Sequence, residues 1–176
     1  YKVVYIPDPL CWTEAPASAN ILGRQRNRWT RGTAETLWIH RVLFFNPTYG
    51  LLGILSVPYW FFFEWLAPII ELVGIMFCLL LIVLGGINWH VFVILLIMVY
   101  AFAVMLSTVA ILFEEMSYRQ YTARGDMLKL FIVALLEPIV HHPRIVYWAI
   151  LGNIDLITGK KNWGEMTRQG FGKKTS

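Results

Sequence analysis

The stretch WHVFVILLIMVYAFAVMLSTVAILF, residues 89–113, contains 25 residues and no charged side chain. A helix needs about 20 consecutive apolar residues to cross the hydrocarbon core of a bilayer. Trp89 begins the stretch, and tryptophan is enriched where a span meets the membrane interface. The stretch therefore predicts a membrane-spanning helix.

The composition of the whole chain also indicates a membrane protein. Of its 176 residues, 57% are hydrophobic and 15% are charged. No Lys or Arg lies between Arg41 and Arg119, and only Glu64 and Glu71 carry charge in residues 42–113. So few charges cannot coat a soluble surface, and the composition further excludes a disordered tail, a collagen-like chain and a disulfide scaffold. It does not exclude an enzyme.

Most of the positive charge lies in three segments, residues 24–41, 119–129 and 160–174. Short segments rich in Lys and Arg beside membrane spans stay in the cytoplasm. We therefore expect the QRNRW segment (residues 25–29) and a basic tail (residues 159–176) to be cytoplasmic parts of a multi-pass protein of the cell (inner) membrane. Membrane lipid is an expected partner. Nucleic acid is not, because no nucleic-acid-binding motif accompanies the basic segments.

A second apolar run, residues 51–84, extends over 34 residues. As a helix it would be about 51 Å long, which is too long for one straight span. Pro58 and Pro68 interrupt it, and proline disturbs the interior of a helix. The run predicts an interfacial or re-entrant piece over residues 51–65 and a span over residues 68–84.

The last apolar region, residues 127–151, is interrupted by a polar cluster: Glu137, Pro138, His141, His142, Pro143 and Arg144. A simple crossing would bury this cluster in the bilayer, which is costly for charged groups. We expect instead two half-length helices, residues 127–140 and 145–157, which dip into the membrane or lie at its cytoplasmic face and leave the tail inside. His141 and His142 are not expected to bind metal, because adjacent residues on a helix point about 100° apart and no third ligand is near.

The N-terminal residues combine a strand signal with helix signals. The run YKVVYIPDP, residues 1–9, is rich in β-branched and aromatic residues and ends in Pro-Asp-Pro, which indicates a strand that leaves a sheet. Pro16 and Ser18 then predict the start of a helix, and Gly32 predicts its end. A second, interfacial helix is expected over residues 33–45.

The first of these helices carries the most informative motif, QRNRW. Gln25, Arg28 and Trp29 are three and four residues apart, so they share one helix face. An arginine fork matches two phosphate oxygens, a glutamine amide exchanges hydrogen bonds with hydroxyls, and an indole offers a flat wall for a sugar ring. Such a face suits a sugar phosphate. The alternative is a basic helix that binds anionic lipid through its arginines.

The string QRNRW, preceded by CWTEAP (residues 11–16) and followed by Arg31-Gly32, resembles the Q-x-x-R-W motif of processive, membrane-integrated family 2 glycosyltransferases. That family includes the cellulose, chitin, hyaluronan and poly-N-acetylglucosamine synthases. The resemblance continues at Asn46-Pro47 and in the tail WGEMTRQGF (residues 163–171). It implies that the motif lies on a cytoplasmic helix that closes the active site.

The resemblance implies an inverting enzyme that transfers sugar from a nucleotide-sugar donor to a growing β-linked polysaccharide of the cell envelope. Gln25, Arg28 and Trp29 would contact the donor diphosphate and the acceptor. The family also needs a divalent cation, Mg²⁺ or Mn²⁺, and a Thr-Glu-Asp motif with the general base, whereas Thr13-Glu14 is followed by Ala15. We therefore expect the base and the metal ligands upstream of Tyr1, none in this chain, and a fragment that is inactive alone.

Together these signals predict an all-α membrane protein of amphipathic interfacial helices and transmembrane helices, preceded by the trailing edge of a truncated α/β nucleotide-sugar-binding domain. The expected units are a remnant of the cytoplasmic glycosyltransferase domain with the QRNRW helix (residues 1–32), interfacial helices (33–65), two transmembrane helices (66–113), a cytoplasmic loop with Pro-broken hydrophobic helices (114–158) and the basic tail (159–176).

Three carboxylates are further candidates for acceptor or channel contacts. Glu14 contacts the acceptor or caps the basic helix that follows it. Glu64 and Glu71 lie seven residues apart in an apolar run, where carboxylates contact a transported or bound group or pair with Arg or Trp of the interfacial helices. Two other interpretations of the chain stay open, a non-catalytic membrane-anchoring module and a small transporter or channel segment.

Overall fold

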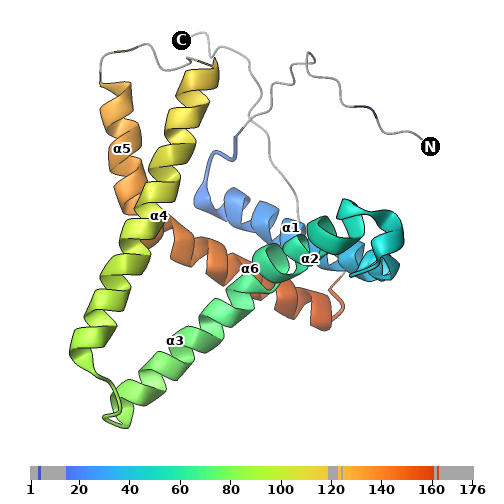
Figure 1. Ribbon diagram of the computed structural model, residues 1–176, viewed down its shortest axis with the longest axis horizontal. Helices are drawn as coiled ribbons and strands as arrows, with labels where there is room; N and C mark the ends of the chain where they lie inside the picture. The colour runs from blue at the N-terminus through green and yellow to red at the C-terminus, as the bar shows by residue number, and fades with distance from the viewer. Residues whose placement is uncertain (1–3, 5–14, 119–122, 124, 161, 163–176) are drawn as a thin grey trace.

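The computed structural model describes residue 4, residues 15–118, 123, 125–160 and 162. Every regular element within these residues is helical (Figure 1). Apart from Val4, the strand expected over residues 1–9 lies outside the described residues, as does Glu14. The described part of the chain is therefore an all-helical arrangement, as its hydropathy pattern predicts.

Helix α1 (Ala19–Ile39) carries the QRNRW motif. Ser18 caps its N-terminus, with its side-chain hydroxyl accepting a hydrogen bond from the Ile21 N–H at 3.4 Å, so the predicted start is confirmed. The predicted stop at Gly32 is wrong, because α1 runs through it. A mid-helix glycine costs only about 1 kcal/mol relative to alanine, and the buried residues Arg31 and Ala34 on either side of Gly32 pack within the protein. The separate helix expected over residues 33–45 is consequently the second half of α1, which ends at Ile39.

Short turns connect α1 to the membrane helices. Two 3₁₀ turns, η1 (Arg41–Leu43) and η2 (Pro47–Tyr49), lead into a continuous helical piece made of η3 (Leu52–Ser56), α2 (Val57–Tyr59) and η4 (Trp60–Trp65). The hydrogen bonds of η3 and η4 are of the π type, which lets the helix pass Pro58. The sequence predicts a break at Pro58, but the helical piece continues through this residue.

The predicted break beside Pro68 is confirmed. The piece Leu52–Trp65 meets α3 (Ala67–Val83) at an angle of 42°. Pro68 lies in the first turn of α3, where its missing N–H leaves no intrahelical bond unmade. The bend separates the predicted interfacial piece from the predicted span.

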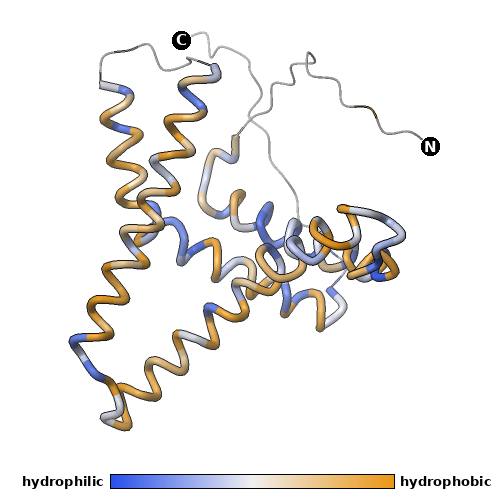
Figure 2. Tube along the Cα trace, viewed as in Figure 1, coloured by the Kyte–Doolittle hydropathy of each residue, from blue (hydrophilic) through white to orange (hydrophobic). Residues whose placement is uncertain are grey.

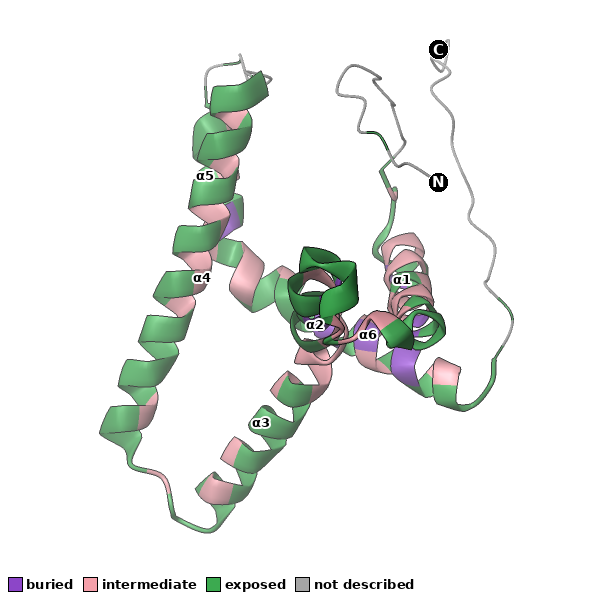
Figure 3. Cartoon of the chain, turned by 45° about the vertical axis from the view of Figure 1, so that its right-hand side comes forward, coloured by how far each residue is buried: buried purple, intermediate pink, exposed green. Residues whose placement is uncertain are grey.

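Helices α3 and α4 (Trp89–Tyr118) form a V-shaped hairpin joined at residues 84–88 (Figure 1). Neither contains a buried residue, and Figure 3 shows them mostly exposed, with some half-buried positions. Hydrophobic residues cover both, whereas hydrophilic residues gather on α1 and near the start of α6 (Figure 2). An apolar surface of this extent needs lipid around it, so the protein is a membrane protein. The predicted span ends at Phe113, but helix α4 continues to Tyr118 and so includes the charged residues Glu114 and Glu115.

The C-terminal helical run turns sharply in direction without a helical break. It consists of α5 (Asp126–Leu136), the π turn η5 (Glu137–His141) and α6 (His142–Ile157). Figure 1 shows α5 beside α4 and α6 crossing α1. The two separate helices that the sequence predicts are thus joined, because the π turn accommodates Pro138. By length and composition Asp126–Ile157 qualifies as a membrane span, like Trp89–Tyr118, and the bent pair Leu52–Trp65 with Ala67–Val83 would be a third.

Protein packing concentrates where α1 crosses α6. Buried residues come from both helices: Gly23, Arg31 and Ala34 from α1, and Val146, Ala149, Gly152 and Asn153 from α6 (Figure 3). A Cβ atom on Gly152 would lie 3.0 Å from the Asn27 carbonyl oxygen, and one on Gly23 would lie 2.6 Å from the Trp148 indole nitrogen. The two helices therefore approach so closely that only small residues fit at these positions.

Candidate functional site

Two of the three motif residues line a large cavity. Arg28 and Trp29 lie on its α1 wall, and the piece Leu52–Trp65 and α6 form the other walls. The cavity volume is about 940 Å³. Gln25 is half-buried on α1 and is not among the lining residues, although its spacing places it on the same helix face as Trp29. The structure thus brings Arg28 and Trp29 to one site and leaves Gln25 beside it.

Aromatic side chains form much of the cavity wall. Trp29 is 54% exposed and Trp60 is 50% exposed, and Trp65 joins them from the end of η4. The Trp65 indole nitrogen is buried and has no hydrogen-bond partner within the described ranges. Partly exposed indoles around a cavity provide flat apolar faces, and a buried N–H favours a ligand or water that supplies an acceptor.

Arg26 is a site residue that the sequence did not single out. Its guanidinium carbon lies 4.5 Å from the centre of the Trp29 ring, and Arg26 also lines the cavity. The two residues are three apart on α1, the spacing at which helical side chains meet. A cation over an indole face is attracted by the ring quadrupole, so Arg26 holds the plane of Trp29. The three-residue spacing of Arg26 and Trp29 is the feature of the sequence that could have indicated this contact.

Glu64 and Glu71 have different surroundings. Glu64 lines the cavity that Arg28 and Trp29 also line. Glu71, beyond the 42° bend, pairs instead with His142, whose Nε2 lies 3.0 Å from Glu71 Oε2. Pairing of an intramembrane carboxylate with another side chain was one of the two expectations, but the partner comes from α6 and is not an Arg or Trp of the interfacial helices. The bend therefore divides the two carboxylates between a cavity and a helix contact.

Gly32 leaves part of the cavity open. It lines the cavity, and no atom would lie within 4 Å of a Cβ atom placed on it. Hydroxyl groups of Thr33, Thr36 and Ser56 add hydrogen-bonding capacity nearby. A roomy cavity with indoles, hydroxyls, an Arg and a carboxylate can bind a hydroxylated ligand that carries negative charge.

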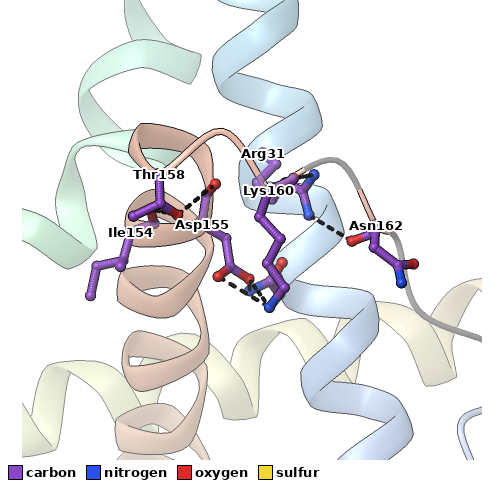
Figure 4. A network of polar contacts seen from close by, with 7 residues as sticks. Arg31, Ile154, Asp155, Thr158, Lys160 and Asn162 are labelled. Carbon is purple, nitrogen blue, oxygen red and sulfur yellow. Dashed lines mark hydrogen bonds and ion pairs between the residues drawn. The ribbon is translucent and has the colours of Figure 1, made fainter.

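A polar network fixes the side of α1 that faces α6 (Figure 4). Asn27 Nδ2 donates a hydrogen bond to Asp155 Oδ2 at 2.9 Å, and Lys160 Nζ lies 3.2 and 3.1 Å from the two Asp155 carboxylate oxygens. Arg31 is 4% exposed and donates to the backbone carbonyls of Lys160 and of Asn162, the latter at 3.3 Å. Sequence reasoning missed the contacts of Asn27 and Arg31, because their partners lie more than a hundred residues away and no local spacing signals them.

The described residues do not form a metal site of the kind that the resemblance implies. Mg²⁺ and Mn²⁺ prefer several carboxylate, carbonyl or water oxygens. Within residues 15–118 and 125–160, no group of three or more His, Cys, Asp or Glu side chains is placed to hold a metal ion. No step of a reaction through a cation is therefore assigned to these residues.

Comparison with protein families gives one finding. The family model described as chitin synthase matches residues 1–174, nearly the whole chain. No curated protein and no solved structure matches. The match extends over the QRNRW motif, the cavity and the α1–α6 crossing, and by itself it assigns no role to any residue.

Proposed function

The chain belongs to the chitin synthase family of membrane glycosyltransferases, and from this membership we propose that it forms the membrane part of an enzyme that elongates a β-linked polysaccharide of N-acetylglucosamine. The donor would be a nucleotide sugar and the acceptor the growing chain. The observation that carries the proposal is the cavity lined by Arg28, Trp29 and Glu64, which lies where α1 meets the first membrane-associated helices.

The cavity has the size and chemistry for the end of a glycan. Its volume of about 940 Å³ falls within the range of small-molecule sites. Indole faces such as those of Trp29 and Trp60 suit the apolar faces of sugar rings, and Glu64 suits their hydroxyls. A polymer leaving this cavity would pass along the helices Leu52–Trp65 and α3. We therefore place α1 and the C-terminal tail on the cytoplasmic side and the α3–α4 hairpin in the bilayer.

In the proposed reaction, an acceptor hydroxyl oxygen forms a bond to the anomeric carbon while the bond from that carbon to the donor phosphate breaks. The hydroxyl proton passes to a carboxylate base, which we expect outside the described residues, as we do the divalent cation. The departing diphosphate gains negative charge, and Arg28 stabilises that charge with a planar fork of donors. Trp29, held by Arg26, stacks against the acceptor sugar, and Gln25 hydrogen-bonds beside them.

The test uses the complete protein that contains this chain, in membrane vesicles supplied with radiolabelled nucleotide sugar. Arg28→Ala is expected to lower polymer formation by about 10²- to 10³-fold, the usual cost of removing one group that stabilises transition-state charge. Arg28→Lys should also fail, because a point charge does not reproduce the fork. The matched control is Arg24→Ala, an exposed arginine one turn earlier on α1 that does not line the cavity. Equal activity of the Arg28 and Arg24 variants would refute the proposal.

A second arm tests the cavity as the acceptor site. Gly32→Leu adds a side chain where the structure leaves open space and should raise the KM for a chitooligosaccharide acceptor about tenfold or more, while helix propensity improves. Gly74→Leu is the control, since Gly74 is equally open but lies on α3 away from the cavity. An unchanged acceptor KM in Gly32→Leu would place the acceptor elsewhere.

A further inference from the structure

We propose that Asp155 is a positioning residue for sugar transfer, which through Asn27 fixes the rotation of α1 and so aims Arg28 and Trp29 into the cavity. The inference rests on the proposed function and concerns the opposite side of α1 from the cavity. Asp155 itself does not line the cavity.

Neighbouring side chains on α1 point to different sides of the helix. Asn27 and Arg28 are adjacent, so their side chains point about 100° apart around the helix. Asn27 Nδ2 donates to Asp155 Oδ2 on α6 at 2.9 Å, and Arg28 lines the cavity. A hydrogen bond to a carboxylate is directional and stronger than one between neutral groups. Because Asn27 and Arg28 are adjacent on one rigid helix, a rotation of α1 that breaks this bond also turns Arg28 away.

The Asp155 carboxylate is itself held in place by Lys160. Lys160 Nζ lies 3.2 and 3.1 Å from its two carboxylate oxygens, and the backbone carbonyl of Lys160 accepts a hydrogen bond from Arg31 (Figure 4). Asn27 and Arg31 are four residues apart and share one face of α1. The end of α6 therefore holds α1 at two points one turn apart, which fixes both its rotation and its position along the axis.

The Asn27–Asp155 hydrogen bond constrains α1 differently from the close packing at Gly152. Gly152, one turn before Asp155, lets α1 approach until a Cβ atom would lie 3.0 Å from the Asn27 carbonyl oxygen and from Thr30 Cβ. Close packing of this kind sets the distance between two helices, but apolar contact is not directional and permits rotation. The Asn27–Asp155 hydrogen bond supplies the direction. Asn27, at a variable position of the Q-x-x-R-W motif, thereby receives a role.

The experiment compares carboxylates that each pair with a lysine on the same C-terminal helical run. Asp155→Ala in the complete synthase should lower kcat for polymer formation about tenfold per folded molecule, the factor that corresponds to one lost charge-assisted hydrogen bond. Asp155→Asn keeps an acceptor for Asn27 and should retain most of the activity. The matched control is Asp126→Ala, which removes an ion pair with Lys129 of 3.0 Å at the start of α5, away from α1. The folded amount is measured from thermal unfolding in detergent.

A reciprocal pair of variants separates positioning from stability. Asn27→Asp sets two carboxylates against each other and should lower kcat more than Asp155→Ala does. Adding Asp155→Asn to that variant restores a donor and an acceptor in reversed order, and it should return kcat to within about threefold of the wild-type value, since the bond is restored but the Lys160 ion pair is weakened. The KM for the acceptor should change less than kcat, because Trp60 and Trp65, which also line the cavity, do not lie on α1 and stay in place.

The outcomes distinguish the two proposals. A wild-type protein that makes no polymer from nucleotide sugars overturns the proposed function. An active wild type in which Arg28→Ala is inactive, but Asp155→Ala keeps the kcat of Asp126→Ala, overturns the positioning role alone. Failure of the reversed pair to restore kcat while thermal stability recovers also overturns it, because the restored hydrogen bond would then contribute to stability without positioning Arg28 and Trp29.

Discussion

The α1–α6 crossing and the α3–α4 hairpin invert the usual relation between polarity and burial. The crossing contains arginine, asparagine and aspartate, yet it holds the most buried side chains of the two regions, including Arg31 at 4% exposure. The hairpin is almost wholly apolar, yet its two helices contain no buried residue. In a soluble protein the apolar helices would form the core. In a membrane protein, lipid covers the apolar helices α3 and α4. The buried positions lie instead in α1 and α6, where polar groups have fixed partners.

The two regions also differ in what determines their geometry. Helices surrounded by lipid gain little hydrophobic energy from packing on each other, and the V of α3 and α4 is correspondingly open. The crossing depends on glycines that permit close approach and on hydrogen bonds with defined partners. Substitutions should therefore have large effects at the crossing and small effects on the hairpin.

The largest expected effect is at Gly152. Gly152→Val places atoms against the Asn27 carbonyl and Thr30, which are 3.0 Å from a Cβ atom at this position, and should lower the free energy of unfolding by up to about 3 kcal/mol. Gly74→Val on α3 meets nothing within 4 Å and is the control. Thermal unfolding of the detergent-solubilised protein measures both. Equal destabilisation would show that the hairpin is packed as tightly as the crossing.

A smaller effect is expected from Arg31→Ala. The change leaves the carbonyls of Lys160 and Asn162 without their buried donor, which should cost about 2 kcal/mol of unfolding free energy. Arg41→Ala serves as the control, because Arg41 is exposed and donates to the Trp38 carbonyl at 3.1 Å within its own segment. Denaturant unfolding monitored by tryptophan fluorescence compares the two. An Arg31 variant as stable as the Arg41 variant would contradict the role of Arg31 in joining α1 to α6.

The smallest effect is expected where the two regions meet. Glu71 of α3 pairs with His142 of α6 at 3.0 Å, but the two side chains are 38% and 48% exposed. Glu71→Gln should therefore change the unfolding free energy by at most about 1 kcal/mol. Glu114→Gln, at the exposed end of α4, is the comparison. A loss well above that of the Arg31 variant would mean that the regions form one cooperative unit through this pair.

Sequence reasoning succeeded where the controlling interactions are local. The uncharged stretch of α4, the cap at Ser18 and the bend beside Pro68 each depend on residues within a few positions of one another. The motif also singled out Arg28 and Trp29, which line the cavity together with Glu64 from the next apolar run, while their contacts with donor and acceptor stay a prediction.

The errors arise where distant residues decide the structure. Gly32 does not end α1, because the buried residues Arg31 and Ala34 pack on either side of it and outweigh one unfavourable residue. The partner of Glu71 is His142, 71 residues away. The polar cluster in the C-terminal run bends a continuous helix instead of dividing it, because a π turn absorbs Pro138. No hydropathy pattern or short spacing encodes such contacts.

The separation of Asn27 and Asp155 by 128 residues has a consequence for biosynthesis. At about 5–20 residues per second, a ribosome needs roughly 6 to 25 s to proceed from one to the other. Both arms of the membrane hairpin emerge during that interval, so the QRNRW helix can dock on α6 only after they have been made. Under the proposed function, the docked QRNRW helix would therefore be available for sugar transfer only after both helices of the hairpin have been synthesised.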